Sequence, residues 1–150
     1  MAGHEMRDES PPTAVPCRGA SPAATHDMLR LGLMEAGRRV RAAAEDGERF
    51  PAARDTLVRF CFAELLPHLE ADESWLSEAR DCPEGRLLAH AIRTEARAMT
   101  AAVYELLAVT SPCEAVAATR VLHALLAAHA HHEDLLTHSR LATGGGTATP

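Results

Sequence analysis

Apolar residues recur every three to four positions in four separate segments of the chain, which is the period of an α-helix. In the first segment, 25–45, this series contains His26, Leu29, Leu33, Ala36 and Val40. Thr25 is a suitable N-cap for it. The positions between are mostly charged, so one face of this helix is predicted to be buried and the other solvated.

The second segment, 51–80, begins with Pro51, a residue suited to a first helical turn. Pro67 falls inside it and predicts a kink, because proline has no N–H to donate and its ring clashes with the preceding turn. The positions predicted to face inward are Leu57, Cys61, Leu65, His68, Asp72 and Leu76.

The third segment, 81–109, opens with Asp81, Pro83 and Glu84, which have the spacing of a capping box with proline in the first turn. The positions predicted to face inward are Leu87, His90, Ala91, Thr94, Ala98 and Ala101.

The fourth segment, 111–141, opens in the same way, with Ser111, Pro112 and Glu114. Its predicted inward positions are Leu122, Leu125, Leu126, His129, Glu133 and Leu136.

Alternating β-branched runs are absent, and the four helical segments are joined by short loops, which favour antiparallel neighbours. The sequence therefore predicts an all-α protein, an up-down-up-down antiparallel four-helix bundle over 23–142. Residues 1–22 are rich in proline, serine and alanine and are predicted to be a flexible tail, as is 143–150, TGGGTATP. No apolar run has the length of a membrane span or resembles a secretory signal, so we expect a cytoplasmic protein without a membrane partner.

The charge balance argues against nucleic acid as a partner. Fifteen Lys and Arg against twenty-one Asp and Glu give a net charge of -6. The one basic cluster, Arg30, Arg38, Arg39 and Arg41, is interpreted as a solvated helix face. The four cysteines are widely separated, without a Cys-x-x-Cys pair, which indicates neither a zinc knuckle nor a disulfide framework.

Histidine is the unusual feature of the composition, with nine residues. Each predicted inward stripe contains one: His26, His68, His90 and His129. Asp72 and Glu133 follow two of them by four residues, on the same helix face. One such pair is equally consistent with an ordinary hydrogen bond. Four stripes together favour a metal site, because buried polar groups are costly unless paired or metal-bound. Imidazole and carboxylate ligands without thiolate suit iron, manganese or zinc.

Four stretches of the chain carry a resemblance to a known family: THDMLRLGL, FAELLPHLEADESWL, LLAHAIRTEARAM and LLAAHAHHEDLL. In order and spacing, these stretches resemble the hemerythrin-like, or HHE cation-binding, domain, over about residues 25–140. The resemblance implies a non-haem di-iron centre inside the bundle that binds or reacts with O2. The ligands that it implies are the histidines His26, His68, His90 and His129, with Asp72 and Glu133 as bridging carboxylates.

Two positions depart from the family's pattern. Asp72 stands where many members have glutamate, and Thr94 where many have a second histidine or a glutamate on the third helix. Since threonine is a poor iron ligand, one iron would lack a protein ligand unless Glu95 or Glu64 replaces it, or water or substrate fills the position. His132 is a candidate for a hydrogen bond to a ligand. His123, His131 and His138 are predicted to face solvent.

The leading hypothesis is a hemerythrin-like di-iron protein that binds or activates O2, peroxide or NO. One alternative is a di-iron oxidase or oxygenase acting on a small-molecule substrate, for example in a biosynthetic pathway. Another is an iron-responsive regulatory or storage protein without catalysis, and a fourth hypothesis is a metal-free structural bundle. No nucleophile–base arrangement or phosphate-binding glycine loop is present, so any catalysis would rest on the metals.

Overall fold

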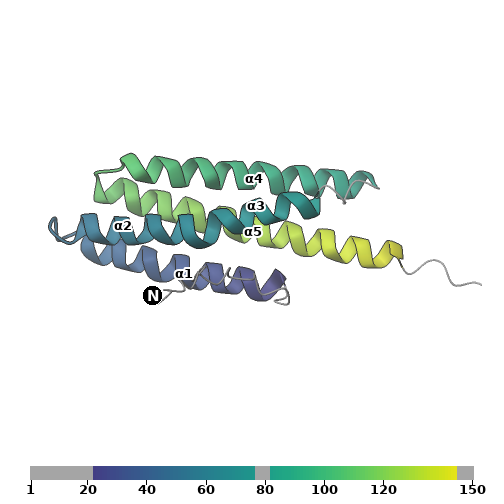
Figure 1. Ribbon diagram of the computed structural model, residues 1–150, viewed down its shortest axis with the longest axis horizontal. Coiled ribbons are helices and arrows are strands. Elements are labelled where there is room, and N and C mark those ends of the chain that lie inside the picture. Colours follow the sequence, from purple (N-terminus) through teal and green to yellow (C-terminus); the bar gives the residue numbers. More distant parts are fainter. Residues whose placement is uncertain (1–21, 77–81, 145–150) are drawn as a thin grey trace, which may run out of the picture.

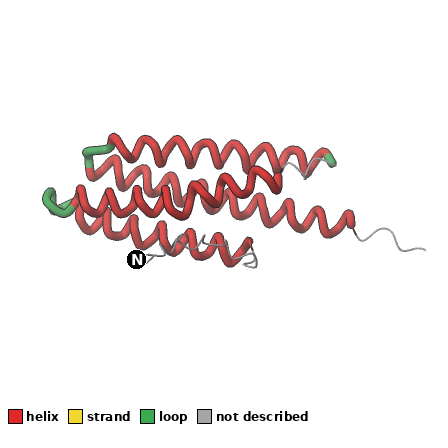
Figure 2. The backbone as a smooth tube through the Cα atoms, in the orientation of Figure 1, coloured by secondary structure: helices red, strands yellow, loops and turns green. Residues whose placement is uncertain are grey.

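The computed structural model describes residues 22–76 and 82–144, and every element in these ranges is helical. The helices are α1 (Pro22–Ala43), α2 (Phe50–Phe60), η1 (Cys61–Leu65), α3 (Leu66–Leu76), α4 (Pro83–Ala108) and α5 (Pro112–Gly144). The helical segments α2, η1 and α3 follow one another without a break, so the described residues form four helical rods, which lie side by side (Figure 1). The loops sit at the ends of the rods (Figure 2). The all-α prediction is confirmed for the described residues.

Several helices begin or end at other residues than the sequence predicts. The first helix begins at Pro22, so Thr25 lies inside it and is not its N-cap, and it ends at Ala43. Helix α5 extends to Gly144, into the predicted C-terminal tail. Helix α4 is capped by Cys82, whose Sγ accepts the Gly85 N–H at 3.2 Å. The predicted cap Asp81, residues 77–80 of the second predicted helix, and the tails 1–21 and 145–150 lie outside the described residues.

The sequence predicts a kink at Pro67, and the structure has a π-helical turn, η1, that ends two residues before this proline. The backbone N–H of Leu66 donates to the carbonyl of Cys61, five residues earlier. In a regular α-helix the Pro67 ring would clash with the carbonyl four residues before it, and the wider π turn relieves this clash. Because η1 lies just before His68 in the chain, it sets the rotation of α3 about its axis. That rotation decides the direction in which the side chains of His68 and Asp72 point.

Most of the buried apolar residues form one cluster, called here the large apolar cluster, which spans all four rods. Its members include Leu29, Leu33, Val40, Leu57, Leu65, Leu69, Met99, Leu106, Leu122 and Leu126. At Gly37 helix α1 packs closely against the Thr119 side chain of α5, since a Cβ on Gly37 would lie 2.5 Å from Cγ2 of Thr119. The stripes predicted for the first and fourth helices are buried, apart from a partly exposed Leu125.

A second, small apolar cluster consists of Leu76, Ala89, Ile92 and Leu136, with Trp75 and Leu88 packed against it. Among the described residues it involves α3, α4 and α5 but not α1 or α2. Along α5 the order is Leu126 in the large cluster, then His129 and Glu133, then Leu136 in the small cluster. Polar residues therefore separate the two clusters.

The inward stripe predicted for the third helix was wrong. Leu87 is 71% exposed, and His90, Thr94, Ala98 and Ala101 are also exposed. The buried residues of α4 are Gly85, Ala89, Ile92, Met99, Ala102, Val103 and Leu106. Apolar residues occur around most of this helix, so periodicity alone left its orientation open. Burying the larger side chains Ile92, Met99 and Leu106 removes more apolar surface from water than burying alanines, and that decided the orientation.

The basic cluster is solvated, as predicted: Arg30, Arg38, Arg39 and Arg41 are all exposed. Arg38 and Arg39 both donate to Glu35, and these hydrogen bonds lower the pKa of Glu35 to about 2. No helix in the described part of the chain is both long enough and apolar enough for a membrane crossing.

Candidate metal centre

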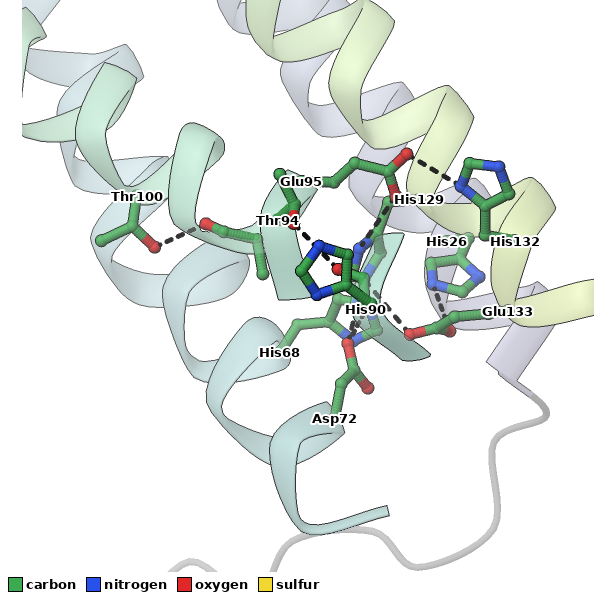
Figure 3. A network of polar contacts seen from close by, with 11 residues as sticks. His26, His68, Asp72, His90, Thr94, Glu95, Thr100, His129, His132 and Glu133 are labelled. Atoms are coloured by element: carbon green, nitrogen blue, oxygen red, sulfur yellow. Dashed lines mark hydrogen bonds and ion pairs between the residues drawn. The ribbon is translucent and has the colours of Figure 1, made fainter. Parts of the chain in front are cut away.

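The polar residues between the two apolar clusters form one compact group, called here the polar layer. It consists of His26 from α1, His68 and Asp72 from α3, Glu95 from α4, and His129 and Glu133 from α5. Their side chains converge between the helices (Figure 3). His26, His129 and Glu133 are buried, and the side chains of His68, Asp72 and Glu95 are at most 16% exposed.

The three histidines divide into a pair and a single residue. The ring centroids of His26 and His68 lie 4.9 Å apart, whereas each lies 6.1 Å from that of His129. The rings meet edge to face and are not stacked.

Both carboxylates lie between the pair and His129. Oδ2 of Asp72 is 3.3 Å from Nε2 of His68 and 3.2 Å from Nε2 of His129, which donates a hydrogen bond to it. Oε2 of Glu133 is 3.1 Å from Nε2 of His26, and Oε1 of Glu133 is 3.2 Å from Nε2 of His129. Each carboxylate thus contacts histidines on both sides of the layer.

Several of these buried atoms are close to a charged neighbour but are not aligned with it for a hydrogen bond. They are Nε2 of His26, Nε2 of His68, Nδ1 of His129, Oε1 of Glu133 and Oε2 of Glu95. Buried polar atoms are nearly always hydrogen-bonded in proteins, so such a concentration calls for a specific cause. A metal ion is one, because it takes up the lone pairs that hydrogen bonds leave unused.

The donor set passes this test of fit. One atom each from His26, His68, His129 and Glu133 lie within 4.8 Å of one another. Two ligands on opposite sides of one ion are about 4.2 Å apart, twice a metal–nitrogen bond of about 2.1 Å. Side-chain movements below about 1 Å would therefore bring the four atoms to ligand distance.

Burial and charge act differently on the individual residues. Burial lowers the pKa of His68, which keeps its lone pair free for a metal. Burial would also lower the pKa of His129, but the carboxylates of Asp72 and Glu133 outweigh it and raise this pKa to about 9. Burial favours the neutral acid of Glu133, but the imidazoles of His129 and His26 hold its pKa well below the usual range. Without metal, both ring nitrogens of His129 are therefore protonated at neutral pH, and metal binding must displace one of these protons.

Glu95 occupies the α4 side of the polar layer. It lies on the buried face of α4, between Ile92 and Met99. Oε1 of Glu95 accepts a hydrogen bond from Nδ1 of His132 at 2.8 Å, and Oε2 lies 4.0 Å from Nδ1 of His129. Glu95 therefore faces the edge of the His129 ring away from Asp72 and Glu133.

Three other predicted site residues are not brought into the layer. His90 and Thr94 are exposed on α4, and the Thr94 hydroxyl donates to the backbone carbonyl of His90 at 2.9 Å. Glu64 is exposed on η1. The misplacement of His90 and Thr94 follows from the orientation of α4. If the sequence analysis had weighted the apolar residues of α4 by their size, it would have predicted that Glu95 faces inward instead of His90 and Thr94.

The remaining histidines mostly follow the expectation. His131 and His138 are exposed, and His132 is partly buried beside Glu95. His123, predicted to face solvent, is half-buried, and burial lowers its pKa.

No family model, curated protein or solved structure matches the chain. The class of site that the residues define is a buried histidine–carboxylate group with the donor chemistry of a metal centre.

Proposed function

We propose that this chain is a hemerythrin-like protein, an up-down-up-down four-helix bundle with a non-haem di-iron site that binds or activates O2, peroxide or NO. Its ligands are His26, His68, Asp72, His129 and Glu133. The observation that carries the proposal is the placement of both carboxylates between the His26–His68 pair and His129. Carboxylates that bridge two ions occupy this position in bundle cores.

The five residues would hold the two ions, with the imidazoles of His26, His68 and His129 as neutral ligands and the carboxylates of Asp72 and Glu133 as anionic ones. Ferrous iron held in this way would supply the electrons with which O2 is reduced. The protein's own contribution is to fix the ligands on three helices and to keep bulk water out, with an apolar cluster on either side of the layer.

The direct test is reconstitution of the metal-free protein with Fe(II) under anaerobic conditions. We expect about two irons per chain and new near-ultraviolet absorption when air is admitted. In the variant His129→Ala we expect the second iron and the new absorption to be lost. The exposed neighbour His131→Ala is the matched control and should behave like the unsubstituted chain.

The metal count distinguishes the outcomes. One iron per chain would mean that the ligands surround a single ion and would contradict the di-iron proposal. Refusal of iron, zinc and manganese alike would contradict any metal function and favour a structural bundle.

A second candidate function follows from the α4 side of the layer. Because His90 and Thr94 are exposed, the described part of α4 contributes no histidine to the layer, which offers one histidine fewer than the sequence predicted for two ions. An open coordination position favours a di-iron oxidase or oxygenase over a reversible carrier, since a small-molecule substrate can reach it. Substrate-dependent O2 consumption by the iron-loaded protein would support this candidate, whereas reversible O2 binding without turnover would contradict it.

A further inference from the structure

One contact at the polar layer remains incomplete in the structure. Nδ1 of His129 and Oε2 of Glu95 are both buried, neither has a hydrogen-bond partner, and they lie 4.0 Å apart. A hydrogen bond between nitrogen and oxygen is about 2.9 Å long, so a shift of about 1 Å would form one. The two unsatisfied atoms are complementary, because a ring N–H donates and a carboxylate oxygen accepts.

We propose that Glu95 is a positioning residue, which accepts a hydrogen bond from Nδ1–H of His129 and thereby holds Nε2 of His129 toward the metal. This inference rests on the proposed metal function. Metal-bound histidines commonly donate their second ring N–H to a carboxylate, which fixes the tautomer and the direction of the ring.

The geometry assigns Glu95 this indirect role instead of that of a ligand. Asp72 and Glu133 approach Nε2 of His129, whereas Glu95 approaches Nδ1, a different edge of the same ring. A metal ion at Nε2 would therefore lie across the ring from Glu95. Glu95 is thus the residue of α4 that faces the layer, where the sequence suggested His90 or Thr94. Its role is to accept a hydrogen bond and not to bind the metal.

His132 completes the arrangement from the surface side. Its Nδ1 donates to Oε1 of Glu95 at 2.8 Å, while its side chain is 30% exposed. This hydrogen bond uses one carboxylate oxygen and leaves the other directed at His129 (Figure 3). The orientation of His129 thus depends on a chain of contacts from α5 to α4 and back to α5.

The test measures Zn(II) affinity by competition with a chelator, together with the His129 Nδ1–H resonance by NMR of the zinc-loaded protein. Glu95→Leu removes the acceptor and should weaken zinc binding by about 10- to 100-fold and abolish the protected resonance. Glu95→Gln keeps an acceptor oxygen and should restore the resonance and most of the affinity. Glu105→Leu, an exposed glutamate on the same helix, is the matched control and should change neither.

His132→Leu tests the outer contact, with the exposed His131→Leu as its control. We expect a loss of affinity smaller than that of Glu95→Leu, because the Glu95 carboxylate remains. Circular dichroism shows whether each variant is folded. If Glu95→Leu does not fold, Glu95→Asp replaces it, since the shorter side chain keeps the charge but withdraws the acceptor, and it should also weaken binding.

The outcomes separate the two proposals. Failure of the unsubstituted chain to bind zinc, iron or manganese would overturn both. Zinc binding that is unchanged in a folded Glu95→Leu or Glu95→Asp variant, with the resonance retained, would overturn the positioning role of Glu95 and leave the metal function standing.

Discussion

The large apolar cluster and the polar layer are both buried between the same helices, but they are built on opposite principles. In the large cluster, residues such as Leu33, Leu57 and Leu106 are fully buried and have only apolar neighbours to satisfy. In the polar layer, His129 is equally buried and carries a nitrogen without a hydrogen-bond partner. Burial of apolar side chains stabilises the fold, whereas burial of imidazole and carboxylate groups costs stability unless something binds them.

This difference assigns the two regions different tasks. The large cluster fixes the helices relative to one another, and this rigidity holds the imidazole and carboxylate groups of the polar layer close together. The small apolar cluster of Leu76, Ala89, Ile92 and Leu136 lies on the other side of the layer. Because it lies between two apolar clusters, the polar layer is shielded from water without containing apolar residues itself.

The largest expected effect on stability comes from the large cluster. Leu106 is fully buried, whereas its neighbour Leu107 is 50% exposed. We expect Leu106→Ala to lower the free energy of unfolding by about 2–5 kcal/mol, because it removes buried methyl groups and leaves a cavity. The matched variant Leu107→Ala should change it by less than about 0.5 kcal/mol. Urea denaturation of the metal-free proteins measures both, and equal effects would contradict the assigned burial.

Metal binding should stabilise the chain through the polar layer alone. At a free metal concentration 100 times the dissociation constant, a ligand that binds only the folded state raises the free energy of unfolding by about 2.7 kcal/mol. We expect this gain for the unsubstituted chain and for His131→Ala, but little or none for His68→Ala. Thermal unfolding with and without Zn(II) measures the difference. A similar gain in His68→Ala would show that the metal binds elsewhere.

The pH dependence of the metal-free protein should also originate in the polar layer. The pKa of His129 is raised to about 9 in the folded state, so its contribution to stability is complete below the unfolded pKa of about 6.5. That contribution is lost as the pH rises toward 9, by at most about 3 kcal/mol. Denaturation between pH 6.5 and 8.5 tests this. The variant His129→Leu should lack the decline, and an unsubstituted chain without it would contradict the raised pKa.

The acidic side of the profile has the opposite sign. The pKa of Glu133 is held low, so its contribution to stability is present above its unfolded pKa of about 4.5 and is lost as the pH falls. Burial lowers the pKa of His68 and of His123, so these residues also reduce stability as the pH falls below their unfolded value of about 6.5. The metal-free protein should therefore be most stable near pH 6.5. Cys61 stays neutral over the whole profile, because burial raises its pKa to about 12.

The two regions also differ in how far the sequence predicts them. The stripe of α1 could be predicted because charged residues interrupt its apolar series, and that of α5 because most of its leucines fall on one face. His26, His68, Asp72, His129 and Glu133 could be identified for the same reason, as polar residues on otherwise apolar stripes. The orientation of α4 could not, since alanine and leucine occur around most of its circumference.

The role of Glu95 is a consequence of that orientation. In the orientation of α4 that the sequence predicts, Glu95 follows Thr94 by one residue and therefore lies off the inward stripe, pointing away from the core. Only the packing of Ile92 and Met99 turns it toward His129. The distances between carboxylates and imidazoles likewise depend on all four rods together, which no local pattern encodes.

The smallest expected effect concerns η1, which joins the large cluster to the polar layer. Pro67→Ala would permit a regular α-helix here and add one backbone hydrogen bond, worth about 0.5–1.5 kcal/mol. Straightening the helix would rotate α3 relative to α2 and misplace Leu69 and Leu76, each worth about 1.5–3 kcal/mol when buried. Packing therefore outweighs the hydrogen bond, and η1 should persist in the variant.

We accordingly expect Pro67→Ala to bind the same number of metal ions and to change the free energy of unfolding by less than about 1 kcal/mol. Metal counting and urea denaturation check these two expectations, with Pro51→Ala, in the exposed first turn of α2, as the control. If Pro67→Ala stays folded but loses metal, then Pro67 itself, and not the apolar packing on either side, directs His68 and Asp72 into the polar layer. The large cluster would then position only part of the site, and Pro67 would have to be counted beside it as a second element that positions the residues of the polar layer.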